Sequence, residues 1–306
     1  MNPLHLLRAM RPQQWVKNMF VLAALVFARG ARGDLLAGDL ADVRRTLYAF
    51  IAFCLGSSAI YLVNDVMDVE SDRKHPTKKS RPIAAGQVAI QAALAVSAAC
   101  VALALAISYF AQAPGITGPT VQHVVAAYMV LNLAYSLKLK HLVLVDAFCI
   151  AAGFLLRVIA GGQAAGAQIS HWLMLCTLFL SLFLALCKRR AESDLLGDDR
   201  GHHRAILTEY NQGFIDQMVT VLAACTILTY TMYTVSEETA RKFGPDNHLL
   251  WTVPFVVFGL ARYMLLVQTQ KGGGSPTRVL LGGDVPFLVN TLGWMATVAW
   301  VVIDHG

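Results

Sequence analysis

The sequence contains few charged residues for its length. Only 14% of the 306 residues are Asp, Glu, Lys or Arg, whereas soluble domains carry about 25%. Hydrophobic residues make up 56% of the chain, and the mean hydropathy is +0.54. This composition excludes an ordinary water-soluble protein and indicates an integral membrane protein, which we expect to form a single domain over residues 1–306.

The cysteines also lack the spacing of a metal site, and no cleavable signal peptide is evident. The first residues, MNPLHLLRAMRPQQWVKN, mix bases with apolar residues and are typical of a helix that lies at a membrane surface. We interpret the cysteines as small core residues because all six lie inside or at the edge of apolar runs: Cys54, Cys100, Cys149, Cys176, Cys187 and Cys225.

Long apolar runs account for most of the chain. A membrane-spanning helix needs roughly 20 mostly apolar residues, and stretches rich in Gly, Pro, Ser and Asp separate the candidates. The sequence therefore predicts an all-α, polytopic membrane protein with nine transmembrane helices, near residues 16–28, 45–66, 88–110, 121–137, 142–161, 171–187, 214–233, 249–268 and 285–303.

Basic residues are distributed unequally between the two sides of these spans. Most of the 25 Lys and Arg residues fall on the side of the N-terminus, largely after the second and sixth spans. The positive-inside rule places that side in the cytoplasm, so we expect a multi-pass protein of the cell inner (plasma) membrane with its active site at the cytoplasmic side. Topology explains the net charge of +6, and no nucleic acid is expected as a partner.

Acidic residues are concentrated in one short stretch, NDVMDVESD, directly after the second apolar run. If the helix continues through Asp72, then Asp65, Asp68 and Asp72 share one face, and Asn64 lies one turn before Asp68. Carboxylates so close together repel each other unless a cation lies among them, and Mg²⁺ prefers such oxygen ligands together with substrate phosphates. The stretch predicts half of a Mg²⁺–diphosphate site; the alternative is a solvated helix end. Glu70 points elsewhere and is expected to be a surface acid.

Basic residues gather in three other segments on the same side. RKHPTKKSRP contains Arg81, whose guanidinium suits bidentate phosphate contact. CKRRAESDLLGDDR and YSLKLKH place further bases at the ends of predicted spans, where they either anchor the helices or bind phosphate. Arg157 and Arg262 lie within spans and either line a lipid-phosphate pocket or extend to the nearer membrane surface.

The combined motifs resemble the UbiA superfamily of intramembrane prenyltransferases. NDVMDVESD fits the NDxxDxxxD motif of that family, and RPQQWVKN, KKSRPIAAGQV and YSLKLKH are similar to its other motifs. The resemblance covers nearly the whole chain. It implies a UbiA-type bundle around a central cavity, a Mg²⁺–diphosphate site at the cytoplasmic end, and transfer onto or from a long isoprenoid.

One segment departs from the usual family pattern. Ordinary members carry a second acidic motif after the sixth span, where this chain reads KRRAESD, with Asp194 and Asp198 further along. The chain resembles in this respect the branch that transfers phosphoribosyl from 5-phosphoribosyl 1-diphosphate (PRPP) to decaprenyl phosphate for arabinan synthesis. Both of those substrates are anionic, so such a site needs more bases than one for a prenyl diphosphate and an aromatic acceptor.

The resemblance and the residue patterns together predict a set of site residues. Lys188, Arg189 and Arg190 are expected to hold a ribose-side phosphate, and the other bases the diphosphate or lipid phosphate. The predicted catalytic metal ligands are Asn64, Asp65, Asp68 and Asp72, and the predicted substrate-binding residues are Lys17, Arg81, Tyr135, Lys138, Lys140, Lys188, Arg189, Arg190 and Glu192.

Two other functions are compatible with the sequence. A polyprenyltransferase acting on an aromatic or porphyrin acceptor, in quinone or haem biosynthesis, would use the same acidic motif. A transporter that uses intramembrane charges as an ion path would need acids in the middle of spans, whereas nearly all acids here lie in predicted loops. Membrane lipid is an expected partner, and a homo-oligomer is left open.

Overall fold

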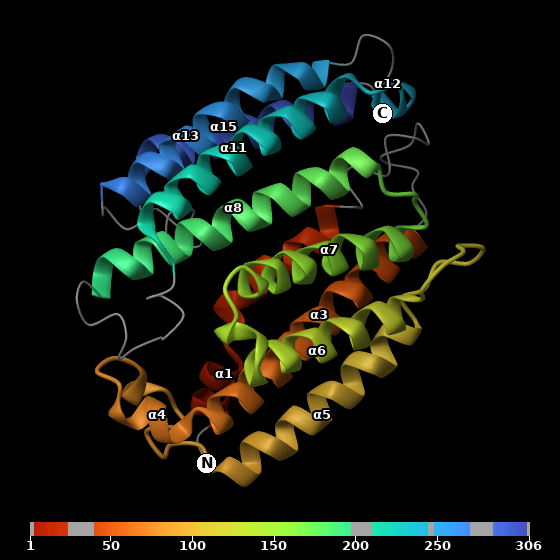
Figure 1. Ribbon diagram of the computed structural model, residues 1–306. Helices are drawn as coiled ribbons and strands as arrows, with labels where there is room; N and C mark the ends of the chain where they lie inside the picture. Colours follow the sequence, from red (N-terminus) through yellow and green to blue (C-terminus); the bar gives the residue numbers. More distant parts are fainter. Residues whose placement is uncertain (1–2, 24–39, 197–209, 244–247, 270–283, 305–306) are drawn as a thin grey trace. The chain divides into compact units, whose positions relative to one another are not determined.

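The computed structural model describes residues 3–23, 40–196, 210–243, 248–269 and 284–304. All regular elements in these ranges are helices, which confirms the all-α prediction (Figure 1). The chain divides into two compact units, and each is described by itself. Unit 1 comprises residues 1–28, 39–137 and 156–168, and unit 2 comprises residues 29–38, 138–155 and 169–306. The prediction of one domain over residues 1–306 stays a prediction.

Unit 1 is built around the long helix α3. The 28-residue helix α3 packs along α5, and both contact α6 (Figure 1). The elements of this unit are α1 (Pro3–Met10), the 3₁₀ turn η1 (Pro12–Asn18), α3 (Leu40–Met67), α4 (Val69–Lys74), η2 (Lys78–Ser80), α5 (Ile90–Tyr109), α6 (Val121–Leu137) and the second half of α7 (Val145–Ala165).

Unit 2 is built around the pair α8 and α11, which pack along each other. Helix α13 packs against both α11 and α8, and α15 packs against α13. The elements of this unit are η3 (Leu139–His141), the first half of α7, α8 (His171–Leu196), α11 (Gln212–Val235), α12 (Glu237–Phe243), η5 (His248–Thr252), α13 (Val253–Gln268) and α15 (Val285–Asp304).

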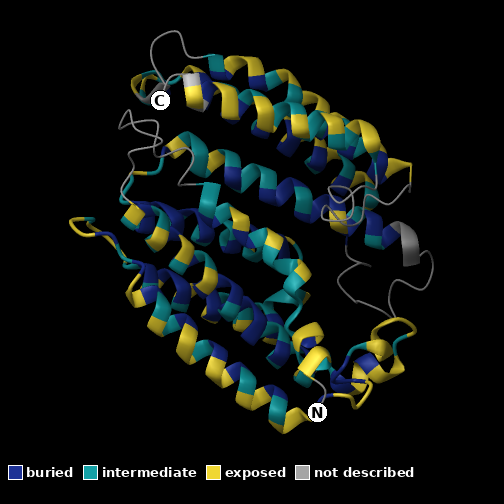
Figure 2. Cartoon of the chain, turned by 180° about the vertical axis from the view of Figure 1, so that it is seen from behind, coloured by how far each residue is buried: buried dark blue, intermediate teal, exposed yellow. Residues whose placement is uncertain are grey.

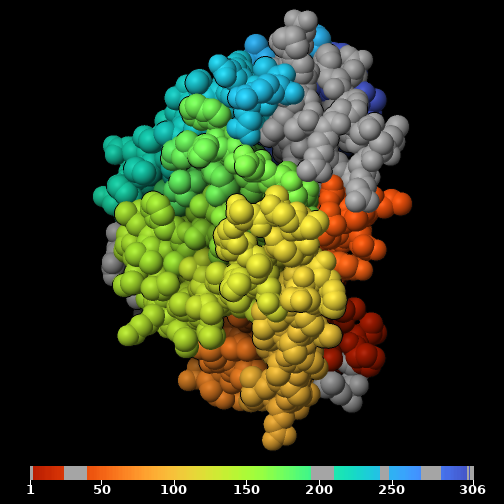
Figure 3. Space-filling model, turned by 90° about the vertical axis from the view of Figure 1, so that its right-hand side faces the viewer, coloured from red at the N-terminus to blue at the C-terminus, as the bar shows by residue number. Residues whose placement is uncertain are grey.

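Six helices in the described ranges are long and apolar enough to cross a membrane, and two shorter apolar helices cover residues 121–137 and 285–301. Together they match eight of the predicted spans. The remaining one, residues 16–28, begins in η1 and runs into residues that lie outside the described ranges, so the count of nine stays a prediction. The outward face of α5 is largely exposed, as Figures 2 and 3 show, and is suited to contact with lipid.

The predicted end of the sixth span is wrong. The apolar run ends at Cys187, but α8 continues to Leu196 and includes the basic residues that follow the predicted span. Its residues are good helix formers apart from Ser193 and Asp194, and internal ion pairs one turn apart support the extension. Lys188, Arg189 and Arg190 therefore lie on a helix, so that their side chains point in different directions around its axis.

An ion pair joins the two helices of the α13–α15 hairpin. Nε and Nη2 of Arg262 donate to the two carboxylate oxygens of Asp284 at 3.1 and 2.7 Å. Arg262 therefore has a carboxylate partner directly before α15, and the two roles expected for it, in a lipid-phosphate pocket or extended to the nearer membrane surface, stay predictions. The guanidinium holds the pKa of Asp284 below its ordinary value.

This depressed pKa predicts an acid-sensitive contribution to stability. The charged form of Asp284 stabilises the fold above its unfolded-state pKa of about 3.9, and the contribution is lost as pH falls through the lower folded-state pKa. In detergent, we expect the wild type to lose more thermal stability between about pH 5 and 3 than Asp284→Asn does. If the melting temperatures of the two proteins fell equally over this pH range, the assignment of this stability contribution to Asp284 would be wrong.

Candidate active site

The acidic stretch lies at the end of α3 and in α4. The predicted continuous helix is interrupted, because α3 ends at Met67 and α4 begins at Val69. Asp68, with ψ of 4°, forms the junction, although Asp68 N–H still bonds the Asn64 carbonyl at 2.9 Å and Asp72 N–H bonds the Asp68 carbonyl at 2.8 Å. The interruption is therefore a local bend, across which Asp65 and Asp72 stay close to one shared partner.

Two arginines neutralise the buried acids of this stretch. Asp65 and Asp72 are 1% and 2% exposed. Nη1 of Arg81 donates to Asp65 Oδ1 at 3.2 Å and to Asp72 Oδ2 at 2.6 Å. Arg11 donates to the same oxygen of Asp65 at 2.5 Å, and its guanidinium lies over the Tyr61 ring at 5.0 Å. Taking charged groups out of water costs free energy, and ion-pair partners such as these arginines offset that cost.

The four predicted metal ligands do not form one preassembled cluster. Asp68 accepts a hydrogen bond from the Asn64 amide at 3.2 Å, and no group of three His, Cys, Asp or Glu side chains within the described ranges is arranged to hold a metal. The donor chemistry nevertheless fits Mg²⁺, because Asp65 and Asp72 share one cationic nitrogen and Mg²⁺ usually takes one or two carboxylates plus substrate phosphates. Glu70 is 76% exposed and pairs with Arg73, as expected for a surface acid.

The segment RPQQWVKN is docked onto α3 by buried polar contacts. Trp15 donates to Ser58 Oγ at 3.0 Å, and the Asn18 amide reaches Ser57 Oγ at 3.4 Å and Cys54 Sγ at 3.3 Å. Arg11 begins this segment with φ of 55°, in the left-handed region. The predicted site residue Lys17 lies within it, half-buried and next to the fully buried Asn18.

Arg157 holds the same segment from α7. It is 6% exposed, so it does not extend to a membrane surface. Its Nε donates to Asn18 Oδ1 at 2.8 Å, and its Nη2 donates to the Tyr128 hydroxyl at 2.9 Å. The guanidinium also lies over the Tyr128 and Phe53 rings, at 4.6 and 5.8 Å from their centroids. Arg157 is therefore part of the internal support of unit 1.

The basic end of α8 contains one buried and two more accessible bases. Arg189 is 1% exposed; it donates to Asp146 at 2.7 Å and pairs with Glu192. Arg190 donates to Asp216 at 2.8 Å, and the exposed Lys188 lies 3.8 Å from Glu192, one helical turn further along α8. A direct phosphate contact by Arg189 would require it to leave these partners, whereas Lys188 and Arg190 are more accessible.

Asp146 and Tyr210, which the sequence analysis did not single out, connect Arg189 to the turn before α7. Tyr210 donates to Asp146 Oδ1 at 2.8 Å and accepts the Leu144 N–H at 2.8 Å. Burial and the neighbouring Asp146 raise the pKa of Tyr210, so its hydroxyl stays protonated at neutral pH. No local spacing could reveal the contact, because Tyr210 lies 66 residues from Leu144.

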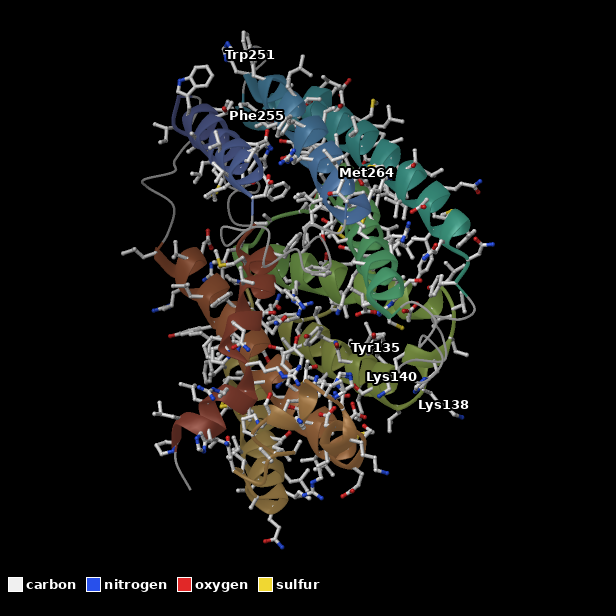
Figure 4. The ribbon with its side chains drawn as sticks, turned by 90° about the vertical axis from the view of Figure 1, so that its left-hand side faces the viewer. Tyr135, Lys138, Lys140, Trp251, Phe255 and Met264 are labelled. Atoms are coloured by element: carbon white, nitrogen blue, oxygen red, sulfur yellow. The ribbon has the colours of Figure 1, made fainter. Side chains whose placement is uncertain are left out.

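The turn from α6 to α7 contains the two lysines of YSLKLKH. Lys138 is exposed and Lys140 is half-buried, and Figure 4 shows both on this turn, shortly after Tyr135 at the end of α6. Tyr135 is itself half-buried. Both lysines belong to unit 2 and Tyr135 to unit 1. The side chain of Asp194, and Asp198, lie outside the described residues.

Comparison with known proteins is consistent with these motifs. Residues 18–271 match the UbiA prenyltransferase family. The chain is 36% identical over 297 residues to the decaprenyl-phosphate phosphoribosyltransferase of Corynebacterium glutamicum, covering 97% of this chain and 86% of that protein. It is 35% identical over 297 residues to the protein of the same name from Mycobacterium tuberculosis, covering 96% and 93%.

A solved structure shows the same fold. A UbiA homolog from Archaeoglobus fulgidus, bound to DMAPP and Mg²⁺, has a TM-score of 0.69 and 17% identity, covering 97% of this chain and 98% of that chain. The family match over residues 18–271 includes the acidic stretch on α3 and α4. The chain belongs to the UbiA prenyltransferase family.

Proposed function

We propose that this protein transfers the 5-phosphoribosyl group of PRPP to decaprenyl phosphate, giving decaprenylphosphoryl-5-phosphoribose and diphosphate. The observation that carries this proposal is the similarity, over nearly the full chain, to relatives named decaprenyl-phosphate phosphoribosyltransferase. The product would serve arabinan and arabinogalactan synthesis in cell-wall biogenesis. We place the active site at the cytoplasmic side of the inner (plasma) membrane, in a bundle of nine spans around a central cavity.

The basic end of α8 favours this reaction over prenyl transfer to an aromatic or porphyrin acceptor. Lys188 and Arg190 lie at the end of α8. The resemblance to the family implies a second acidic motif at this place in ordinary members, where it would suit a second metal on a prenyl diphosphate. PRPP brings a 5-phosphate as well as a diphosphate, and a terminal monophosphate needs cationic donors. We assign Lys188 and Arg190 to this phosphate, with Glu192 and Arg189 holding their helix end in place.

Catalysis would depend on neutralising the diphosphate as it leaves. Mg²⁺ held by Asp65 and Asp72, with Asp68 and Asn64 nearby, would supply charge neutralisation for that group. Arg81 forms ion pairs with both carboxylates and Arg11 with Asp65, and the remaining N–H groups of the two guanidinium groups suit phosphate oxygens. Lys17, Lys138, Lys140 and Tyr135 would position the diphosphate or the lipid phosphate.

The chemical step needs little help from a base. The C1–O bond between ribose and diphosphate breaks, and an oxygen of the lipid phosphate forms the new bond to C1. That oxygen is already anionic at neutral pH, so no proton has to be removed before the attack. The protein's contribution is therefore orientation and electrostatic stabilisation of the departing charge.

Labelled donors distinguish the two candidate reactions. Purified protein in detergent is supplied with decaprenyl phosphate, Mg²⁺ and PRPP labelled in the ribose; we expect label in a lipid-extractable product and release of diphosphate. A parallel reaction receives labelled prenyl diphosphate with aromatic or porphyrin acceptors. Prenylated acceptor together with unchanged PRPP would contradict the proposal and favour the alternative.

A further inference from the structure

The turn that bears Lys138 and Lys140 ends in an unfavourable backbone conformation. Leu144 has φ of 66°, and within the described ranges only Arg11 is another non-glycine residue with positive φ. A leucine in this region is strained by its Cβ and persists only where its surroundings hold it. Leu144 directly precedes α7, and the Leu144 carbonyl accepts the Phe148 N–H at 2.9 Å in the first turn of that helix.

A single hydroxyl from a distant element holds Leu144. Tyr210, just before α11, accepts the Leu144 N–H at 2.8 Å. The same hydroxyl donates to Asp146 Oδ1 at 2.8 Å, and Asp146 Oδ2 accepts from Arg189 Nε at 2.7 Å. Tyr210, Asp146 and Arg189 are 2%, 0% and 1% exposed. The direction of the hydroxyl is thus fixed by a buried ion pair, and water does not compete for it.

The geometry points to Tyr210 as a positioning residue that sets the path of the α6–α7 turn, and with it Lys138 and Lys140, for a phosphate-bearing substrate. This inference rests on the proposed function, because it concerns how the lysines of that site are placed. The phosphate belongs either to the diphosphate of PRPP or to the lipid, and both carry the same chemistry. Tyr210 acts on the turn through its hydrogen bond with the Leu144 N–H.

Packing alone does not explain the hydroxyl. The ring of Tyr210 belongs to the apolar core of unit 2, together with Leu186 and Ile215, and a phenylalanine would fill nearly the same volume. Without the hydroxyl, Leu144 N–H loses its acceptor and the left-handed conformation loses its hold. The lysine-bearing turn then has access to other paths, while the Arg189–Asp146 pair remains in place.

The test compares Tyr210→Phe with a matched hydroxyl deletion. Tyr230→Phe is the control, because the Tyr230 hydroxyl is also buried in unit 2 and bonds Thr252 at 2.6 Å and Trp294 at 3.0 Å, away from the turn. KM is measured for PRPP at saturating decaprenyl phosphate and for decaprenyl phosphate at saturating PRPP. We expect Tyr210→Phe to raise one KM by about five- to tenfold, the equivalent of one lost hydrogen bond, with kcat within about twofold.

The substrate whose KM changes identifies the source of the phosphate. Tyr230→Phe should leave both KM values at the wild-type level, even if its melting temperature falls as far as that of Tyr210→Phe. Equal KM values for Tyr210→Phe and wild type, or a fall in kcat at constant KM, would overturn the inference. Hydrogen exchange of the Leu144 amide provides a readout without turnover: it should accelerate about tenfold in Tyr210→Phe and not in Tyr230→Phe.

A second variant covers the case in which Tyr210→Phe does not fold. Leu144→Pro leaves Tyr210, Asp146 and Arg189 intact but removes the amide donor and restricts φ to about −65°. Leu144→Pro should raise the KM for one of the two substrates, and unchanged KM values for both substrates would again overturn the inference. If wild-type protein makes no product, the proposed function fails, whereas the exchange experiment still decides whether Tyr210 holds the turn.

Discussion

Asp65→Asn should reduce turnover by about 10²–10³-fold, the usual effect of removing one group that stabilises charge in the transition state. The substitution keeps the shape of a side chain that is 1% exposed and removes only its charge. Arg11 and Arg81 would then lose the charged partner that they share, Arg81 would keep its ion pair with Asp72, and the proposed Mg²⁺ site would lose a carboxylate. The measurement is kcat for release of diphosphate from PRPP by purified protein.

Glu70→Gln is the matched control for this prediction. Glu70 lies in the same acidic stretch, but it is 76% exposed and pairs only with the neighbouring Arg73 among the contacts in this region. It should keep wild-type turnover. A folded Asp65→Asn protein, judged by its melting curve, with turnover equal to that of Glu70→Gln would show that the charge of Asp65 has no catalytic role.

Arg189→Met should destabilise the protein by about 3–5 kcal/mol, because it leaves the fully buried Asp146 without its cationic partner. Thermal unfolding in detergent measures the effect. Lys188→Met is the stability control, since the Lys188 side chain is 47% exposed and its ion pair with Glu192 spans 3.8 Å. Its expected change is within about 0.5 kcal/mol.

A double variant tests the reason for that loss. Arg189→Met combined with Asp146→Asn leaves no unpaired charge, so it should be more stable than Arg189→Met alone. Asparagine retains a carbonyl oxygen that can accept the hydrogen bond of the Tyr210 hydroxyl, so the second substitution should cause little further loss of stability. If the two substitutions destabilise additively, the energetic role assigned to the buried ion pair is wrong.

Local pattern was sufficient for the positions of most helices and for the acidic stretch. The apolar runs predict eight helices that the structure contains, because a membrane span needs a continuous run of apolar residues. The same dependence on apolar runs explains why the end of α8 was predicted too early. Hydropathy falls at Lys188, whereas α8 continues to Leu196, supported by ion pairs from Lys188 and Arg189 to Glu192.

The sequence by itself determined the membrane-protein class, the family motifs and the concentration of acids after the second long apolar run, because each depends on residues that are neighbours along the chain. Only the tertiary structure decided which charges face one another. Arg11 meets Asp65 across 54 residues, and Tyr210 meets Leu144 across 66. Such contacts arise when helices pack and burial forces each charge or polar group to find a partner, and no spacing along the chain encodes that choice.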